Sequence, residues 1–215
     1  MDERTVAPEW LDSLPANSPE ALRSRRDLRI IHRFMRTQSW LTRELTALTP
    51  QARMSIAELG AGDGHLLPAV RSKLTDLQVC GYDLISQPLK WPADWNWQSG
   101  DFTRLNGFSE LAVIALMILH HFENDKLLEL GQKLQAGGTR YLLALEPARY
   151  QKHIVMLRAG GLLGFCKTTL HDGAVSIRAG FRGDELPHRL GLDRAQWSWH
   201  CHTTITGAYR MLAWR

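Results

Sequence analysis

Residues 58–64, Glu-Leu-Gly-Ala-Gly-Asp-Gly, combine three glycines on alternate positions with two carboxylates. Glycines at this spacing let the chain turn sharply, and a ligand can approach a backbone that carries no Cβ. The segment follows the apolar pair Ile56-Ala57 and precedes Leu66, Leu67 and Val70 at helical spacing. The pattern therefore predicts a ligand-binding turn between a strand and a helix that covers about residues 64–75.

The spacing of these glycines separates two kinds of cofactor. A dinucleotide turn has the pattern G-x-G-x-x-G and receives a pyrophosphate at the helix N-terminus. Here the third glycine comes one residue earlier, and Glu58 and Asp63 would repel a pyrophosphate. The acidic turn instead favours a cationic ligand that carries an amino group.

The segment resembles the glycine-rich first motif of class I S-adenosylmethionine (SAM)-dependent methyltransferases. The resemblance implies SAM as cofactor and S-adenosylhomocysteine (SAH) as product. It also implies cofactor contacts along the turn, from Glu58, Gly60, Ala61, Gly62, Asp63 and Gly64.

A third acid follows the next predicted strand, residues 77–82. Asp83 lies 19 positions past Gly64, which leaves room for the crossover helix of a βαβ unit. An acid at the end of this strand can accept hydrogen bonds from both ribose hydroxyls, so Asp83 is the expected ribose ligand, with Leu84 beside it. The alternative is an aspartate that only forms a turn.

Asp101 and Phe102 follow the third predicted strand. The methyltransferase pattern places an aspartate here that accepts a hydrogen bond from the adenine amino group, and an apolar neighbour that packs on the ring. Both residues match in type and order. The alternative is an N-cap aspartate that begins a turn.

The longest apolar run, residues 111–119, predicts a buried parallel strand. The resemblance implies that Leu116 and Met117 contact the cofactor. The run leads into His120-His121-Phe122, and Leu-His-His-Phe resembles the motif after strand four of small-molecule methyltransferases, including the quinone-biosynthesis type.

His120 is the expected general base, because a neutral imidazole at the end of a central strand can take a proton from an acceptor. His121 is the second catalytic candidate. The alternative is that these histidines only shape the pocket. Glu146, after the predicted strand 141–145, and His171 are the candidate substrate contacts, although Glu146 could instead fix a loop.

Composition excludes several classes of protein. The 215 residues, 44% of them hydrophobic, suit one globular domain. No apolar run is long enough to span a membrane, and the first ten residues lack an apolar signal core, so we expect a cytoplasmic protein. Cys80, Cys166 and Cys201 have no metal-binding spacing, and His200 and His202 lack further ligands nearby, so no metal is expected.

Seven arginines lie between residues 23 and 43. Ser18 as cap and Pro19 at the first helical position predict that a helix begins here. The basic face of that helix is open to three interpretations: a solvated surface, a site for an anionic substrate, or a contact with RNA.

Together these features predict an α/β fold, a Rossmann-like sheet of seven strands in the order 3-2-1-4-5-7-6 with strand 7 antiparallel and helices on both faces. Residues 1–50 are expected to form an N-terminal helical lid on the methyltransferase domain, residues 51–215, which carries a variable substrate insert at 147–196. A short helix is expected after Gly183. Residues 197–205 and 208–214 flank Thr206-Gly207 and predict a β-hairpin at the edge of the sheet.

The expected function is methyl transfer from SAM to oxygen or carbon of a small molecule of phenolic, polyketide or quinone type. One alternative is an RNA methyltransferase that uses the arginine-rich helix; another is a protein that binds SAM without turnover. The chain has no Asn/Asp-Pro-Pro-Tyr motif and no Pro-Cys pair, which argues against methylation of nucleic-acid amino groups or of cytosine carbon.

Overall fold

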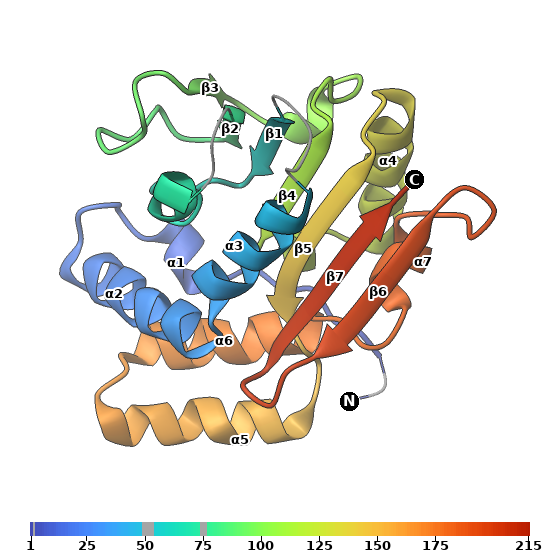
Figure 1. The fold of residues 1–215 in the computed structure, drawn as a ribbon. Helices are drawn as coiled ribbons and strands as arrows, with labels where there is room; N and C mark the ends of the chain where they lie inside the picture. Colours follow the sequence, from blue (N-terminus) through green and yellow to red (C-terminus); the bar gives the residue numbers. More distant parts are fainter. Residues whose placement is uncertain (2, 49–53, 74–76) are drawn as a thin grey trace.

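A computed structural model describes residues 1, 3–48, 54–73 and 77–215. Seven strands form one sheet in the order β3-β2-β1-β4-β5-β7-β6 (Figure 1). The pairs from β3 to β5 are parallel, and β7 is antiparallel to β5 and β6. The predicted order is confirmed. The strands are β1 (Met54–Leu59), β2 (Leu77–Asp83), β3 (Asn96–Ser99), β4 (Ala112–Leu116), β5 (Tyr141–Pro147), β6 (Ser198–Thr203) and β7 (Ala208–Trp214).

Helices cover both faces of the sheet, which is why the central strands are apolar on both sides. On one face, α3 (Thr37–Leu48) packs Trp40, Leu41 and Leu45 into a core with residues of β1, β4 and β5. On the other face, α4 (Asn124–Ala136) packs its buried leucines against the opposite side of the same strands.

The fourth strand is shorter than the predicted 111–119. Strand β4 ends at Leu116 because Met117 adopts a left-handed conformation with φ of 58°, and its N–H donates to Leu145 O at 2.8 Å. The chain then turns into a short 3₁₀ helix, η3 (Leu119–His121). This turn brings the two histidines back over the end of the strand.

The predicted helix over residues 64–75 is wrong within the described part of the chain. A 3₁₀ helix, η1 (Pro68–Lys73), is formed instead; residues 74 and 75 lie outside the described residues. Pro68 explains the difference, because proline lacks an N–H and its ring would clash with the carbonyl of residue 64 in an α-helix.

The N-terminal helices are α1 (Trp10–Ser13), α2 (Pro19–Phe34) and α3. Ser18 caps α2 as predicted and accepts a hydrogen bond from Ala21 N at 3.2 Å. The buried Asp27 of α2 accepts a hydrogen bond from Cys166 N at 2.8 Å, at the start of α6. The N-terminal helices are therefore tied to the region 147–196.

That region is helical: α5 (Gln151–Gly160), α6 (Lys167–Ala179) and α7 (Glu185–Arg189). Helix α7 confirms the short helix predicted after Gly183. Figure 1 shows α5 and α6 below the end of β5, next to α2.

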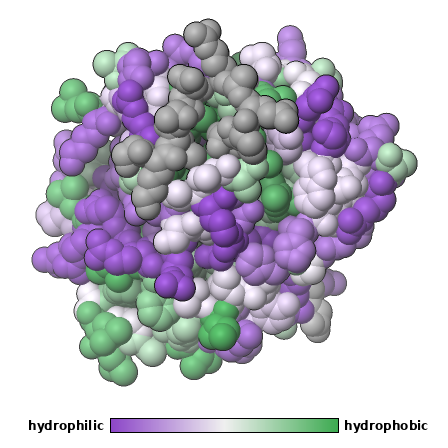
Figure 2. Space-filling model, viewed as in Figure 1, coloured by the Kyte–Doolittle hydropathy of each residue, from purple (hydrophilic) through white to green (hydrophobic). Residues whose placement is uncertain are grey.

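Most of the surface seen in Figure 2 is hydrophilic, and hydrophobic residues gather at the lower left. Leu162 and Leu163, between α5 and α6, are both largely exposed. Within the described part of the chain, no helix is both long enough and apolar enough to cross a membrane.

Candidate active site

The parallel strands end together at one edge of the sheet. Leu59 is in register with Tyr82, Asp83 with Ser99, and Leu116 with Leu145. Strand β1 lies between β2 and β4, so the chain leaves its carboxyl end where the strand order reverses, which is where open α/β sheets bind ligands. The fold thus gathers the turns after β1, β2, β3 and β4 at a single site.

The glycine turn after β1 has the backbone shape that its sequence requires. Gly60, Gly62 and Gly64 have φ values of 65°, 57° and 66°, in the left-handed region that glycine tolerates best. A Cβ on Gly60 would lie 2.6 Å from Ile118 Cγ1. The turn after β1 and the segment after β4 are therefore in close contact, and a larger residue at position 60 would push them apart.

Asp83 holds this turn in place. Its Oδ2 accepts a hydrogen bond from Gly62 N at 2.7 Å, and its Oδ1 accepts one from Ile85 N at 3.1 Å. The side chain of Leu84, which follows it, is 76% exposed. Asp83 thus stands at the predicted place beside the glycine turn, and ribose binding by this carboxylate stays a prediction.

Glu58 has the least compensated carboxylate of this group. The residue is only 2% exposed, and its Oε2 has no hydrogen-bond partner among the described residues. Burial, and then the charges of Asp63 and Asp83, raise the pKa of Glu58 to about 8. A cation close to this carboxylate would reverse that effect, since an opposite charge favours the ionised form. The site is therefore suited to a positively charged ligand.

Asp63, in the turn itself, is already paired. It is hydrogen-bonded to His65, and its Oδ2 lies 3.7 Å from Arg29 Nη1 of α2. The hydrogen bond from His65 holds the pKa of Asp63 below its usual value. The second acid of the motif thus connects the turn to the N-terminal helices.

Asp101 caps the 3₁₀ helix η2 (Phe102–Arg104), which is the alternative that the sequence left open. Its Oδ1 accepts hydrogen bonds from Thr103 N at 2.9 Å and from Thr103 Oγ1 at 2.6 Å. Phe102 is buried and packs edge-on against Phe122. A contact of Asp101 with adenine stays a prediction, as do cofactor contacts of the buried Leu116 and of Met117.

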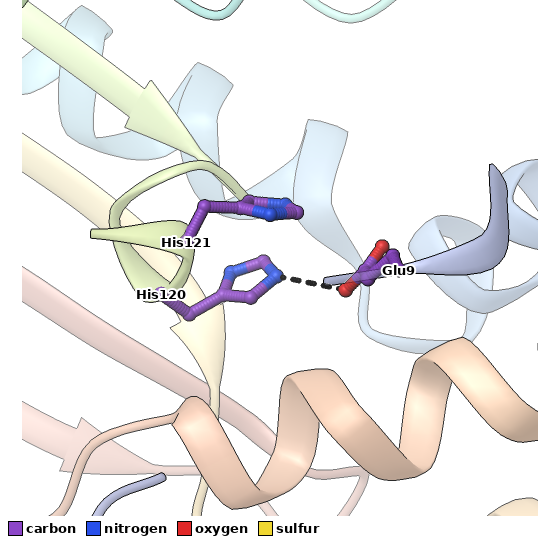
Figure 3. A group of neighbouring side chains, drawn as sticks. All are labelled: Glu9, His120 and His121. Atoms are coloured by element: carbon purple, nitrogen blue, oxygen red, sulfur yellow. Dashed lines mark ion pairs between the residues drawn. The ribbon is translucent and has the colours of Figure 1, made fainter. Parts of the chain in front are cut away.

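His120 lies between two carboxylates (Figure 3). Its Nδ1 is 2.7 Å from Glu146 Oε2, and its Nε2 is 3.5 Å from Glu9 Oε1. Burial alone would lower the pKa of His120, but the hydrogen bonds to Glu146 and Glu9 outweigh it and raise the pKa to about 9. His120 is therefore a cation near neutral pH, which contradicts the expectation of a neutral imidazole at this position.

Glu146 fixes the turn after β4, which is the alternative to substrate contact that the sequence left open. The side chain is fully buried at the end of β5, and its Oε1 accepts hydrogen bonds from Leu119 N at 2.9 Å and Ile118 N at 3.2 Å. With Oε2 bonded to His120, the carboxylate has no free face toward a substrate. The expected substrate contact at this position is corrected to a structural one.

The pKa of His121 is shifted in the opposite direction from that of His120. Burial, and then the charge of His120, lower the pKa of His121 below its ordinary value. The two rings are 4.3 Å apart and tilted by 35°. His121 is consequently a neutral imidazole at neutral pH, and it has the protonation state that a general base requires.

The donor atoms of Glu9, His120 and His121 lie within 4.8 Å of one another, which is close enough for a shared metal ion. Histidine and carboxylate ligands of this kind suit Zn²⁺ and related ions. Both nitrogens of His120 already face carboxylate oxygens, so a proton on this ring satisfies the arrangement without a metal.

Glu9 belongs to an N-terminal arm, residues 4–11, that crosses the histidines. Arg4 Nη2 donates to the carbonyl oxygens of His120 at 2.9 Å and Phe122 at 2.7 Å. Trp10 stacks on His171 with the ring centroids 3.6 Å apart. Glu9 could not be found from the sequence, because Ala-Pro-Glu-Trp matches no motif and the partner His120 lies more than a hundred residues away.

His171 is the second candidate substrate contact, and it lies on α6 beneath this arm. Its Nδ1 is 2.8 Å from Asp172 Oδ1. Asp172 also accepts hydrogen bonds from Trp10 N at 2.8 Å and Leu11 N at 2.9 Å. His171 is thus close to the histidine cluster, and substrate contact by its ring stays a prediction.

Solved structures share this architecture at low sequence identity. The plantazolicin methyltransferase BpumL, in complex with a triazolic desmethylPZN analog and SAH, aligns with a TM-score of 0.73 and 13% identity over 95% of this chain and 93% of that one. The chain has the class I SAM-dependent methyltransferase fold. Magnesium protoporphyrin IX methyltransferase (ChlM) from Synechocystis PCC 6803 with bound SAH aligns with a TM-score of 0.56 and 18% identity over 87% and 84% of the two chains.

Human N-acetylserotonin methyltransferase in complex with SAM aligns with a TM-score of 0.55 and 17% identity, over 95% of this chain and 61% of that one. In sequence, the chain matches no protein-family model and no curated protein. The likeness to a quinone-biosynthesis methyltransferase in particular therefore stays an expectation from the sequence.

Proposed function

We propose that the protein is a SAM-dependent methyltransferase that acts on a small molecule. The observation that carries the proposal is the buried carboxyl group of Glu58 near the end of β1, whose Oε2 has no hydrogen-bond partner among the described residues. SAM carries a positively charged sulfonium and an ammonium group, and either charge would stabilise this carboxylate. The shared fold supports the proposal.

The cofactor-binding residues in this proposal come from the four turns at the strand ends. The three glycines, Gly60, Gly62 and Gly64, leave space for SAM along the backbone. Asp83 accepts hydrogen bonds from the ribose hydroxyls. Asp101 accepts a hydrogen bond from the adenine amino group, and Phe102 packs on the adenine ring. Bound SAM supplies an electrophilic methyl group. The protein contributes alignment of the acceptor and exclusion of water, which are large terms for a bimolecular transfer.

His121 is the proposed general base, in place of His120. A neutral imidazole can accept the proton of a phenol or of an acidic carbon, and an imidazolium at position 120 cannot. His120 instead positions its neighbour and keeps its pKa low. An O- or C-methylated acceptor of phenolic, polyketide or quinone type fits this chemistry.

The first test is cofactor binding. A ligand that binds only the folded state stabilises it by mass action, so saturating SAM or SAH should raise the melting temperature by several degrees. Isothermal titration calorimetry should give a one-to-one complex with each, whereas NAD should not bind to this acidic turn. If neither SAM nor SAH binds at millimolar concentration, the methyltransferase proposal is wrong.

An Asp83→Ala variant should bind SAM about 10 to 100 times more weakly than the wild type, because two ribose hydroxyls lose a charged acceptor and the turn loses its bond from Gly62 N. Calorimetry measures the effect, and circular dichroism checks the fold. Asp94→Ala, which removes an exposed ion pair with Arg71, is the matched control and should bind SAM normally. If Asp83→Ala binds SAM with unchanged affinity, Asp83 only forms a turn and does not bind the ribose.

A further inference from the structure

A pocket of about 250 Å³ lies between the end of α2, the start of α3 and the residues that follow the glycine turn. Arg29, Arg33 and Arg36 line it together with His32 and His65. The arginines belong to the basic segment that the sequence left open among a solvated face, an anionic substrate site and an RNA contact. The proposed methyltransferase chemistry uses none of them.

The positive charges of this pocket are only partly balanced within the described part of the chain. Arg29 faces Asp63 at 3.7 Å, a carboxylate that is also bonded to His65. Arg33 and Arg36 have no carboxylate within 4.0 Å among the described residues. The buried Arg210, outside the lining, donates to Met35 O at 2.6 Å, and burial, with a smaller contribution from the positive charge of Arg36, lowers its pKa. An anion in the pocket would therefore meet at least two unpaired guanidinium groups.

Helix α3 adds backbone donors to the same pocket. The first amide that bonds within the helix is Trp40 N, which donates to Arg36 O at 3.0 Å. The amides of Thr37, Gln38 and Ser39 precede it, so they have no partner inside the helix, and these three residues line the pocket. Free amides at the N-terminus of a helix attract anions, and this helix has 12 residues.

Arg36 occupies the position before α3 in an unusual conformation. Its φ of 54° is in the left-handed region, which is rare for a residue with a Cβ. The residue just before a helix is commonly Ser, Thr, Asp or Asn, whose side-chain oxygen accepts hydrogen bonds from the first amides of the helix. The side chain of arginine has no hydrogen-bond acceptor and cannot do this. The conformation leaves the amides uncapped and places a second cation next to them.

We propose that this pocket binds the carboxylate or phosphate group of a small molecule. Guanidinium groups and helix amides both donate to anionic oxygens, and together they make short, charge-assisted hydrogen bonds. His32 also lines the pocket but adds no charge near neutral pH, because burial and the charge of His65 lower its pKa to about 4. Its Nδ1 is 3.1 Å from Thr37 Oγ1.

The pocket is next to the proposed cofactor site, because His65 and Leu66 line it directly after Gly64. The inference rests on the proposed function for the source of the anion. One source is the carboxylate of SAM, and the other is an acidic group on the methyl acceptor. Both present the same oxygens to Arg33, Arg36 and the start of α3.

Inorganic phosphate is the first probe, measured by calorimetry against the wild type and against an Arg33→Gln, Arg36→Gly double variant. Glycine at position 36 keeps the left-handed backbone and removes only the side chain. We expect saturable binding to the wild type and at least tenfold weaker binding to the double variant. Arg23→Gln, on the same helix but outside the pocket, is the control and should bind phosphate as the wild type does.

The second probe pair is SAM and decarboxylated SAM, which keeps the sulfonium and the amino group. If the double variant loses affinity for SAM tenfold but binds decarboxylated SAM normally, the pocket holds the cofactor carboxylate. If both bind normally while phosphate binding is lost, the anion belongs to the acceptor. Phosphate that fails to bind the wild type, or binds the double variant equally well, overturns the proposal in favour of a solvated face. Phosphate binding without any SAM binding would reject the methyltransferase proposal and keep the anion site.

Discussion

A His121→Gln variant is expected to transfer methyl groups on the order of 10²–10⁴ times more slowly than the wild type, with its affinity for SAM unchanged. Glutamine has a similar reach but cannot accept a proton at neutral pH. The measurement is the initial rate of methyl transfer from SAM to a phenolic acceptor, together with the SAM dissociation constant. His202→Gln, on β6, is a matched control and should retain full activity.

The pH dependence of the rate separates this role from positioning. Burial and the charge of His120 hold the pKa of His121 below its ordinary value, so the ring is already neutral at pH 7. The wild-type rate should therefore not rise above neutral pH and should fall in the acid range, where His121 gains a proton. A glutamine variant with near wild-type turnover would show that the acceptor is nucleophilic without a base at this position.

Glu146→Ala is expected to destabilise the protein by about 3–5 kcal/mol, because it leaves the buried imidazolium of His120 without its closest partner and frees the amides of the turn after β4. The free energy of unfolding in urea measures the effect. Glu129→Gln, on the exposed side of α4, removes ion pairs with Lys126 and Lys133 and should change the stability little.

Stability should also depend on pH in the wild type through this pair. The pKa of His120 is raised to about 9 in the folded protein, from 6.5 for the unperturbed group. The folded state thus holds a proton that the unfolded chain loses, so this contribution is complete below pH 6.5 and disappears as the pH rises through 9. The free energy of unfolding of Glu146→Ala should not show this decrease at alkaline pH. A variant as stable as the wild type at pH 7 would contradict the ion pair.

The central strands β1, β4 and β5 were predictable because each contains a largely apolar run. The central run at 111–119 marked β4, and the apolar stretch before Glu58 marked β1. The predicted helix after the glycine turn failed because the prediction relied on the apolar spacing of Leu66, Leu67 and Val70, although a proline at position 68 interrupts an α-helix that begins at residue 64.

The histidine site was predictable in position but not in charge. Two histidines at the end of β4 follow from the motif. The pKa of His120 depends on Glu9 and Glu146. Glu9 lies more than a hundred residues earlier in the chain, in a segment that matches no sequence motif. Because charge states depend on such distant partners, a sequence motif can locate a titrating group without fixing which form it adopts.

The N-terminal arm can fold into place only late relative to its own synthesis. Arg4 and Glu9 leave the ribosome well before the residues they contact, because His120, Phe122 and Ala179 follow Arg4 by 116, 118 and 175 positions. Domains fold from the N-terminal side during synthesis, and the arm must wait until α6 has emerged. The histidine cluster therefore acquires its second carboxylate only after α6 has emerged, so a nascent chain released before α6 would carry His120 and Glu146 without the arm that covers them.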